Sequence, residues 1–174
     1  MKKLIVVALC MLMWGGEAFA ICQSATITAS TPTADFIDYG NGTVTHTKTG
    51  LMWKQCSEGL STVTTACDTG AATTHTWQAA LQLAETLNAG AGFAGFNDWR
   101  VPNQKELKSI VERQCNNPSI NATIFPATVS SGYWSASPYA SVAAEAWNGD
   151  FLNGDTFGNP KTMSYNVRLI RGGL

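Results

Sequence analysis

The stretch Asn97-Asp98-Trp99-Arg100-Val101-Pro102-Asn103-Gln104-Lys105-Glu106-Leu107 combines a large aromatic ring, a fixed positive charge, a proline and a helix start. Each of these residue types is tolerated only where its special geometry or its partner is supplied. We therefore expect a folded junction here, not a mobile loop. The residues predicted to hold the scaffold at this junction are Trp99, Arg100, Pro102 and Glu106.

Two helices are predicted on either side of the junction. The second begins at Asn103, whose side chain caps it, with Glu106 completing a capping box; it should bury Leu107, Ile110 and Val111. The first helix lies upstream, between the cap Thr76 and the terminating Gly90. Its apolar residues recur at helical spacing and should face the core: Trp77, Ala80, Leu81, Ala84 and Leu87.

Short strands are predicted before and after the helices. Turn signals separate the early strands, and polar, Pro-rich segments separate the late ones. The predicted strands are Phe36–Tyr39, Thr43–Thr47, Leu51–Gln55, Tyr133–Ser137, Ala144–Leu152 and Asn166–Ile170. Because strands flank two helices that are adjacent in sequence, the order indicates an α+β domain with two helices on short antiparallel sheets.

Residues 1–20 are typical of a signal peptide, with two lysines, an apolar run and Ala18-Phe19-Ala20 as the cleavage site. The apolar run is shorter than the roughly 20 residues that a spanning helix needs, so we expect no membrane span after processing. The mature chain should consist of an extended segment, 21–35, and one domain, 36–174. We expect a secreted, periplasmic or cell-surface protein.

Of the five cysteines, one lies in the signal peptide and four remain, an even number for an exported chain. Two disulfides are expected, and four cysteines allow three pairings. We favour Cys56 with Cys67, which bracket a Ser/Thr-rich loop, and Cys22 with Cys115. The alternative is that two cysteines stay free as thiolates.

Several phrases together resemble one known family. They are Gly42-Thr43-Val44-Thr45, Thr49-Gly50-Leu51-Met52-Trp53, Trp77 with Ala80-Leu81, Asp98 to Asn103 with Glu106-Leu107, Tyr133-Trp134-Ser135, Ala146-Trp147 with Phe151, and Val167 to Gly172. This set is similar to the Lcl C-terminal domain family, a domain of unknown function named after a bacterial collagen-like adhesin, over about Phe36 to Gly172. The resemblance implies a disulfide-stabilised C-type-lectin-like fold, export, and surface binding or adhesion.

The chain departs from that family between Asp38 and His46, where two carboxylates that relatives often carry are replaced. Calcium is therefore not expected at this segment, and no cofactor is predicted. The two histidines, His46 and His75, have no partner at a recognised metal spacing and should be solvated turn residues. The formal net charge of −1 disfavours nucleic acid as a partner.

The candidate ligand-binding residues follow the family's late strands, where lectin-like domains often present their ligands. Aromatic rings and side-chain oxygens gather here: Tyr133, Trp134, Trp147, Asn148, Asp150, Asn153 and Asp155. The competing interpretation is simple turn chemistry, because Asn153-Gly154 is a preferred two-residue hairpin turn. The other tryptophans, Trp53, Trp77 and Trp99, and the late Arg168 should support the fold.

No catalytic residues are predicted. Gly90 to Gly95 formally fits a dinucleotide-binding pattern, but it follows a helix where that motif requires a strand. The expected function is binding of a glycan or protein, and a neutral glycan fits better than a sulfated one because Lys105, Lys108 and Arg113 give only a mildly basic face. Two alternatives stay open: a structural or assembly subunit of an envelope complex, and a copper-dependent formylglycine-generating oxidase, which shares the lectin-like scaffold.

Overall fold

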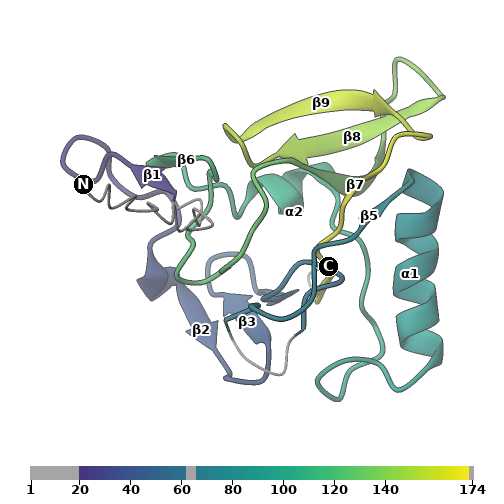
Figure 1. Cartoon of the computed structure of the whole chain (residues 1–174), viewed down its shortest axis with the longest axis horizontal. Helices are drawn as coiled ribbons and strands as arrows, with labels where there is room; N and C mark the ends of the chain where they lie inside the picture. The colour runs from purple at the N-terminus through teal and green to yellow at the C-terminus, as the bar shows by residue number, and fades with distance from the viewer. Residues whose placement is uncertain (1–19, 62–65, 173–174) are drawn as a thin grey trace, which may run out of the picture.

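A computed structural model describes residues 20–61 and 66–172, so the predicted signal peptide lies outside the described residues except for Ala20. Over these residues the fold is α+β, with two α-helices, three sheets and two disulfides. Figure 1 shows helix α1 (Trp77–Ala89) along one side of the molecule and the hairpin of β8 (Glu145–Asp150) and β9 (Asp155–Pro160) across its top. Within the described ranges, no helix is long and apolar enough to cross a membrane.

The early strands form the predicted antiparallel meander, each within one residue of its expected start and end. They are β2 (Phe36–Asp38), β3 (Thr43–His46) and β4 (Leu51–Lys54). The C-terminal strand β11 (Ile170–Arg171) pairs with β4, giving the sheet order β11-β4-β3-β2. The end of the domain is thus hydrogen-bonded to its beginning.

The second sheet has five strands in the order β5-β10-β7-β8-β9. Its members are β5 (Thr74–His75), β7 (Gly132–Pro138), β8 (Glu145–Asp150), β9 (Asp155–Pro160) and β10 (Tyr165–Asn166). The sequence did not predict β9, which contains glycine and proline and gains its order from full-length pairing with β8. The single predicted strand 166–170 is split between β10 and β11, because the chain crosses from one sheet to the other there.

Both predicted helices are present with the predicted caps. Helix α1 (Trp77–Ala89) begins at Thr76, whose hydroxyl accepts a hydrogen bond from the Ala79 N–H. Helix α2 (Gln104–Lys108) carries the complete capping box of Asn103 and Glu106, but it is shorter than expected. Ile110 and Val111 are buried as predicted, although they follow the helix.

The junction at residues 97–107 connects four elements. The Trp99 backbone bonds the side chain of Asn88 near the end of α1, and its buried indole donates to Phe93 O at 3.0 Å. Arg100 exchanges two backbone hydrogen bonds with Ile170 of β11, and its guanidinium binds Glu106 in a bidentate pair at 2.7 Å. The carbonyl of Pro102 accepts from Ala136 of β7. The prediction of a folded junction is confirmed.

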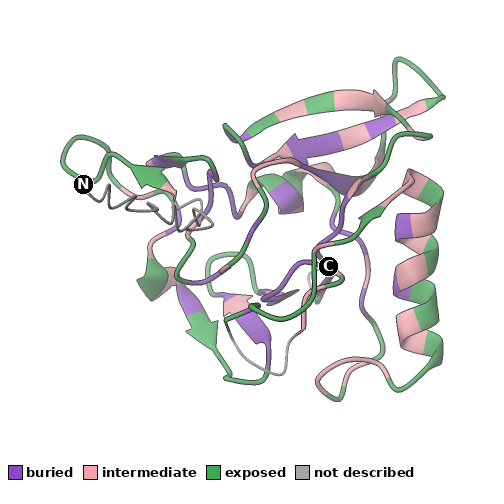
Figure 2. Ribbon diagram, in the orientation of Figure 1, coloured by how far each residue is buried: buried purple, intermediate pink, exposed green. Residues whose placement is uncertain are grey.

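Two hydrophobic clusters form the core. One lies around Trp53, Phe125 and Tyr133 under the four-stranded sheet and α2, and the other joins Trp99 and Trp134 to α1. Figure 2 shows the buried residues concentrated where the sheets and helices face one another. Trp77 is half-buried against the second cluster.

Arg168 is fully buried between the two sheets, which agrees with its predicted supporting role. Its guanidinium donates to the carbonyl of Gln55 and to the hydroxyls of Ser57 and Thr128, and it lies 4.7 Å from the Phe125 ring centre. Its acceptors are neutral, so burial lowers the pKa of this arginine.

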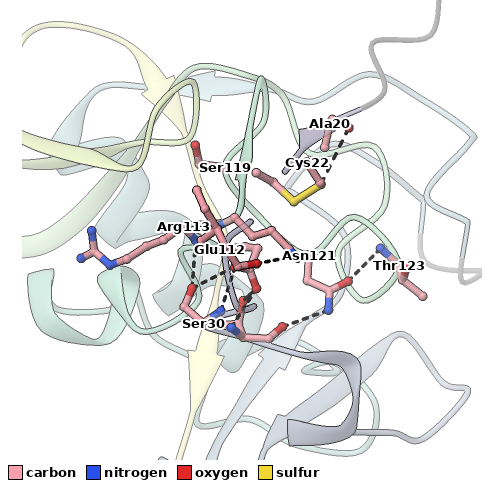
Figure 3. The surroundings of a disulfide bond; sticks show 12 residues. Ala20, Cys22, Ser30, Glu112, Arg113, Ser119, Asn121 and Thr123 are labelled. Atoms are coloured by element: carbon pink, nitrogen blue, oxygen red, sulfur yellow. Dashed lines mark hydrogen bonds between the residues drawn. A yellow bond between two sulfur atoms is a disulfide. The ribbon is translucent and has the colours of Figure 1, made fainter. Parts of the chain in front are cut away.

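The N-terminal segment is held to the domain at several points. Strand β1 (Ile21–Cys22) pairs with β6 (Cys115–Asn116), and the favoured disulfide pairing, Cys22–Cys115 and Cys56–Cys67, is present. Figure 3 shows Ser30 beside the carboxylate of Glu112. Thr31 of this extended segment is buried, and its backbone N–H also donates a hydrogen bond to Glu112.

Candidate functional site

The β8–β9 hairpin carries most of the predicted ligand-binding residues, but it divides them between its two faces. Asn148 lies opposite Phe157, and Asp150 lies opposite Asp155, so these four side chains share one face of the sheet. Trp147 is opposite Gly158 and points to the other face. The structure therefore separates Trp147 from the acidic and amide side chains with which the sequence grouped it.

Tyr133 and Trp134 are fully buried, so the expectation that they are exposed is wrong. Their strand, β7, has β10 on one side and β8 on the other, which places it in the interior of the sheet. The Tyr133 hydroxyl lies 2.7 Å from Ser57 Oγ, and the Trp134 indole donates to His75 O at 2.8 Å. Both rings support the fold, and no local signal indicates which of the aromatic strands is central in the sheet.

The polar residues at the hairpin end mainly close the turn. Asp150 Oδ1 accepts from the Leu152 N–H at 2.8 Å, and Asn153 Nδ2 donates to Asp155 Oδ2 at 2.6 Å. The connection is residues 151–154, longer than the predicted two-residue turn at Asn153-Gly154. Asn148 is 2 % exposed, and its Nδ2 has no hydrogen-bond partner among the described residues.

On the other face, Trp147 forms a cluster with two residues that the sequence did not single out, Tyr139 and Glu145. The Tyr139 and Trp147 rings meet nearly at right angles, with centres 4.7 Å apart. A Cβ atom at Gly158 would lie 2.8 Å from Glu145 Oε2 and 2.9 Å from the Tyr139 ring, so both side chains pass over this glycine. We call Tyr139, Glu145 and Trp147 the aromatic–acid cluster.

The backbone fixes this cluster in place. Tyr139 N–H donates to Glu145 O at 3.0 Å, which closes the turn between β7 and β8. Glu145 and Trp147 stand two residues apart on β8 and so share a face of the strand. All three side chains are half-buried, which leaves part of each in contact with solvent. The feature of the sequence that could have indicated the cluster is Gly158, because its lack of a side chain leaves room for Tyr139 and Glu145.

Trp147 differs from the other tryptophans of the described chain in its indole N–H. The indoles of Trp77, Trp99 and Trp134 donate to backbone carbonyls at 2.8–3.0 Å, and the Trp53 indole N–H has no partner in the described structure but is completely buried. Trp147 makes no such bond with the described residues and is only half-buried. Its N–H group and part of its ring are therefore available to an external partner.

No group of three or more His, Cys, Asp or Glu that could hold a metal ion occurs in the described part of the chain. In the segment from Asp38 to His46, Asp38 accepts hydrogen bonds from Gly40 and Gln55, and Asn41 accepts one from Thr43. His46 is not a solvated turn residue as predicted: it is 4 % exposed and stacks on Phe36. Burial lowers its pKa, more strongly than the opposing charge of Asp35 raises it.

Comparison with known protein families gives a match to this chain. The model of the Lcl C-terminal domain matches residues 42–171, from the β2–β3 turn to the last strand. No curated protein matches the chain. The matched region includes both helices, the junction and the β8–β9 hairpin, and it covers well over half of the sequence. The chain belongs to the Lcl C-terminal domain family.

Proposed function

We propose that this protein is an exported, C-type-lectin-like binding module that recognises a glycan or a protein at the bacterial cell envelope through the aromatic–acid cluster. The observation that carries the proposal is the half-buried Trp147, whose indole N–H has no partner in the described structure, next to Tyr139 and Glu145. Aromatic rings pack against the apolar faces of sugars, and a carboxylate accepts hydrogen bonds from their hydroxyls.

Export is supported by the two disulfides, because such bonds persist in oxidising compartments. The same disulfides favour a binding function over a catalytic one. A copper-dependent oxidase of the formylglycine-generating type requires free thiolates, whereas all four cysteines of the described residues are paired. We therefore place binding before catalysis, with no cofactor and no nucleic acid partner.

The alternative, a structural or assembly subunit, is favoured by a different surface. The edge strand β2 presents Ile37, which is 48 % exposed, and Tyr39, 50 % exposed, follows directly at its end. Apolar side chains next to an unpaired strand edge suit contact with another protein. This reading requires a protein partner and no glycan.

A glycan array with the purified mature protein tests the proposal. Trp147→Ala should abolish the signal, and Phe157→Ala provides a matched control because Phe157 is 47 % exposed on the opposite face of the same hairpin. Loss of binding in both variants, or in neither, would contradict the assignment. Co-purification of a single envelope protein that depends on Ile37 and Tyr39, without any glycan signal, would support the assembly role.

A further inference from the structure

The described chain repeatedly places its own cations over aromatic rings. Lys54 Nζ lies 4.6 Å from the centre of the Phe93 ring, and Lys161 Nζ lies 4.6 Å from that of Trp77. The Arg171 guanidinium lies 3.7 Å from Phe96. In two of these pairs a carboxylate also binds the cation, Glu58 for Lys54 and Asp98 for Arg171, each within 2.7 Å. A unit in which a cation contacts both an aromatic ring and a carboxylate therefore occurs twice in the described part of this fold.

The aromatic–acid cluster has the ring and the carboxylate of this unit and lacks the cation. No lysine or arginine of the described residues forms an ion pair with Glu145 or lies over the Tyr139 or Trp147 ring. Lys161, which follows the end of β9, donates to Ala143 O at 2.7 Å and covers Trp77 instead.

We infer that the group recognised by this cluster is an alkylammonium, such as a protonated amino sugar or a choline-type trimethylammonium. The inference rests on the proposed function and specifies its ligand. A cation near the face of a tryptophan or tyrosine is attracted by the electron-rich ring, and a neighbouring carboxylate adds a direct charge interaction. Two rings at 83° offer two sides of such a site, and Glu145 supplies the third.

The same geometry selects against anionic ligands. A sulfate or uronate bound over Gly158, beside Tyr139, would meet the carboxylate of Glu145, and like charges repel. Neutral sugars can pack on the rings and hydrogen-bond to the carboxylate, but they gain no attraction between opposite charges. The expected order of affinity is therefore alkylammonium, then neutral, then anionic.

Matched probe pairs test this order on the full mature protein by calorimetry and by the indole N–H resonance of Trp147. Choline is compared with 3,3-dimethylbutan-1-ol, which has the same shape without the charge, and glucosamine is compared with glucose and N-acetylglucosamine. We expect each charged probe to bind roughly threefold to tenfold more tightly than its neutral counterpart. The choline and glucosamine arms distinguish the two sources of the ammonium group.

Glu145→Gln keeps the shape of the site and removes its charge, so it should lower the affinity for the charged probes more than the affinity for the neutral ones. Phe157→Ala should change neither. Equal binding within each pair, no binding of either charged probe, or an unchanged preference in Glu145→Gln would overturn the inference. A glycan-array signal that still depended on Trp147 would then leave the proposed function standing with a neutral ligand.

Discussion

The buried carboxylate of Glu112 anchors the irregular N-terminal segment to the domain. Glu112 is 2 % exposed and accepts hydrogen bonds at 2.8–3.0 Å from the backbone N–H groups of Ser30, Thr31 and Gln114 and from the Thr31 hydroxyl. Burial by itself would raise the pKa of this carboxyl, and the hydrogen bonds outweigh it, so the pKa is lowered. A residue that sequence patterns leave unremarkable therefore anchors the N-terminal segment.

Replacing the Glu112 carboxylate should make the free energy of unfolding depend less on pH in the acidic range. A carboxyl group whose pKa is lower in the folded state stabilises the protein at pH values above its ordinary pKa. This contribution is lost as the pH falls through the folded-state pKa. At neutral pH, Glu112→Gln should lower the free energy of unfolding by about 2 kcal/mol, because an amide group now faces hydrogen-bond donors. Urea titrations at pH 7 and at about pH 3 should show this difference shrinking in acid.

The control for that titration is Glu85→Gln, because Glu85 is exposed on α1. It should differ little from the wild type at either pH. A difference at Glu112 that was the same at both pH values would contradict the role of its charge.

Arg168 offers a second test at this scale. Its planar guanidinium reaches acceptors in several directions at once, including Thr128 Oγ1 at 2.7 Å and Ser57 Oγ at 3.2 Å, and an ammonium cannot reproduce that fork. Arg168→Lys should therefore lower the free energy of unfolding by about 2 kcal/mol, measured by denaturant unfolding. Arg113→Lys, at an exposed position, should stay within about 0.5 kcal/mol of the wild type.

Among the helices and strands, sequence signals predicted those features that depend on interactions between neighbouring residues. The caps of both helices and the turns of the early meander depend on neighbours in sequence, so Thr76, Asn103 and the strands from Phe36 to Lys54 could be predicted closely. Strand β9 and the short strands β1, β5 and β6 depend on distant partners and could not. Helix α2 ends earlier than predicted for the same reason: contacts with distant parts of the chain, and not helix propensity, place Ile110 and Val111 in the core.

The capping box is the prediction that belongs to this scale. Asn103→Ala removes the side-chain acceptor of the Glu106 N–H and should lower the free energy of unfolding by about 1 kcal/mol. Glu106→Ala should cost more, because it also breaks the bidentate pair with Arg100. Thermal unfolding should rank the variants in that order, and Lys105→Ala, an exposed position on the same helix, should have little effect. Equal losses in all three would contradict the assignment.

For the whole molecule, the candidate site shows what a sequence pattern leaves undetermined. The sequence predicted a candidate site in the late-strand hairpin, and strand pairing decides that Trp147 and Asp150 point to opposite faces of it. It also brings Tyr139 and Glu145 over Gly158 of another strand. Burial of Tyr133 and Trp134 depends on the order of strands in the five-stranded sheet, which no local signal specifies.

The two disulfides should respond differently to reductant. Cys22 is exposed and Cys115 is 8 % exposed, whereas Cys56 and Cys67 are at most 1 % exposed. A thiolate must reach a sulfur atom to exchange with it, so limiting dithiothreitol should open Cys22–Cys115 first. Alkylation of the native protein followed by mass spectrometry should label that pair before the other, and the reverse order would contradict the prediction.

The Cys22–Cys115 bond also decides how the molecule bears mechanical load. A pull on the N-terminal residue of the predicted mature chain, Ile21, reaches Cys115 through a covalent link, so the force enters the body of the domain close to Glu112 and bypasses the polar contacts of 23–35. Those contacts would peel apart one after another if the bond were absent. In the oxidised protein, tension is transmitted past them to β6 and the segment that follows α2.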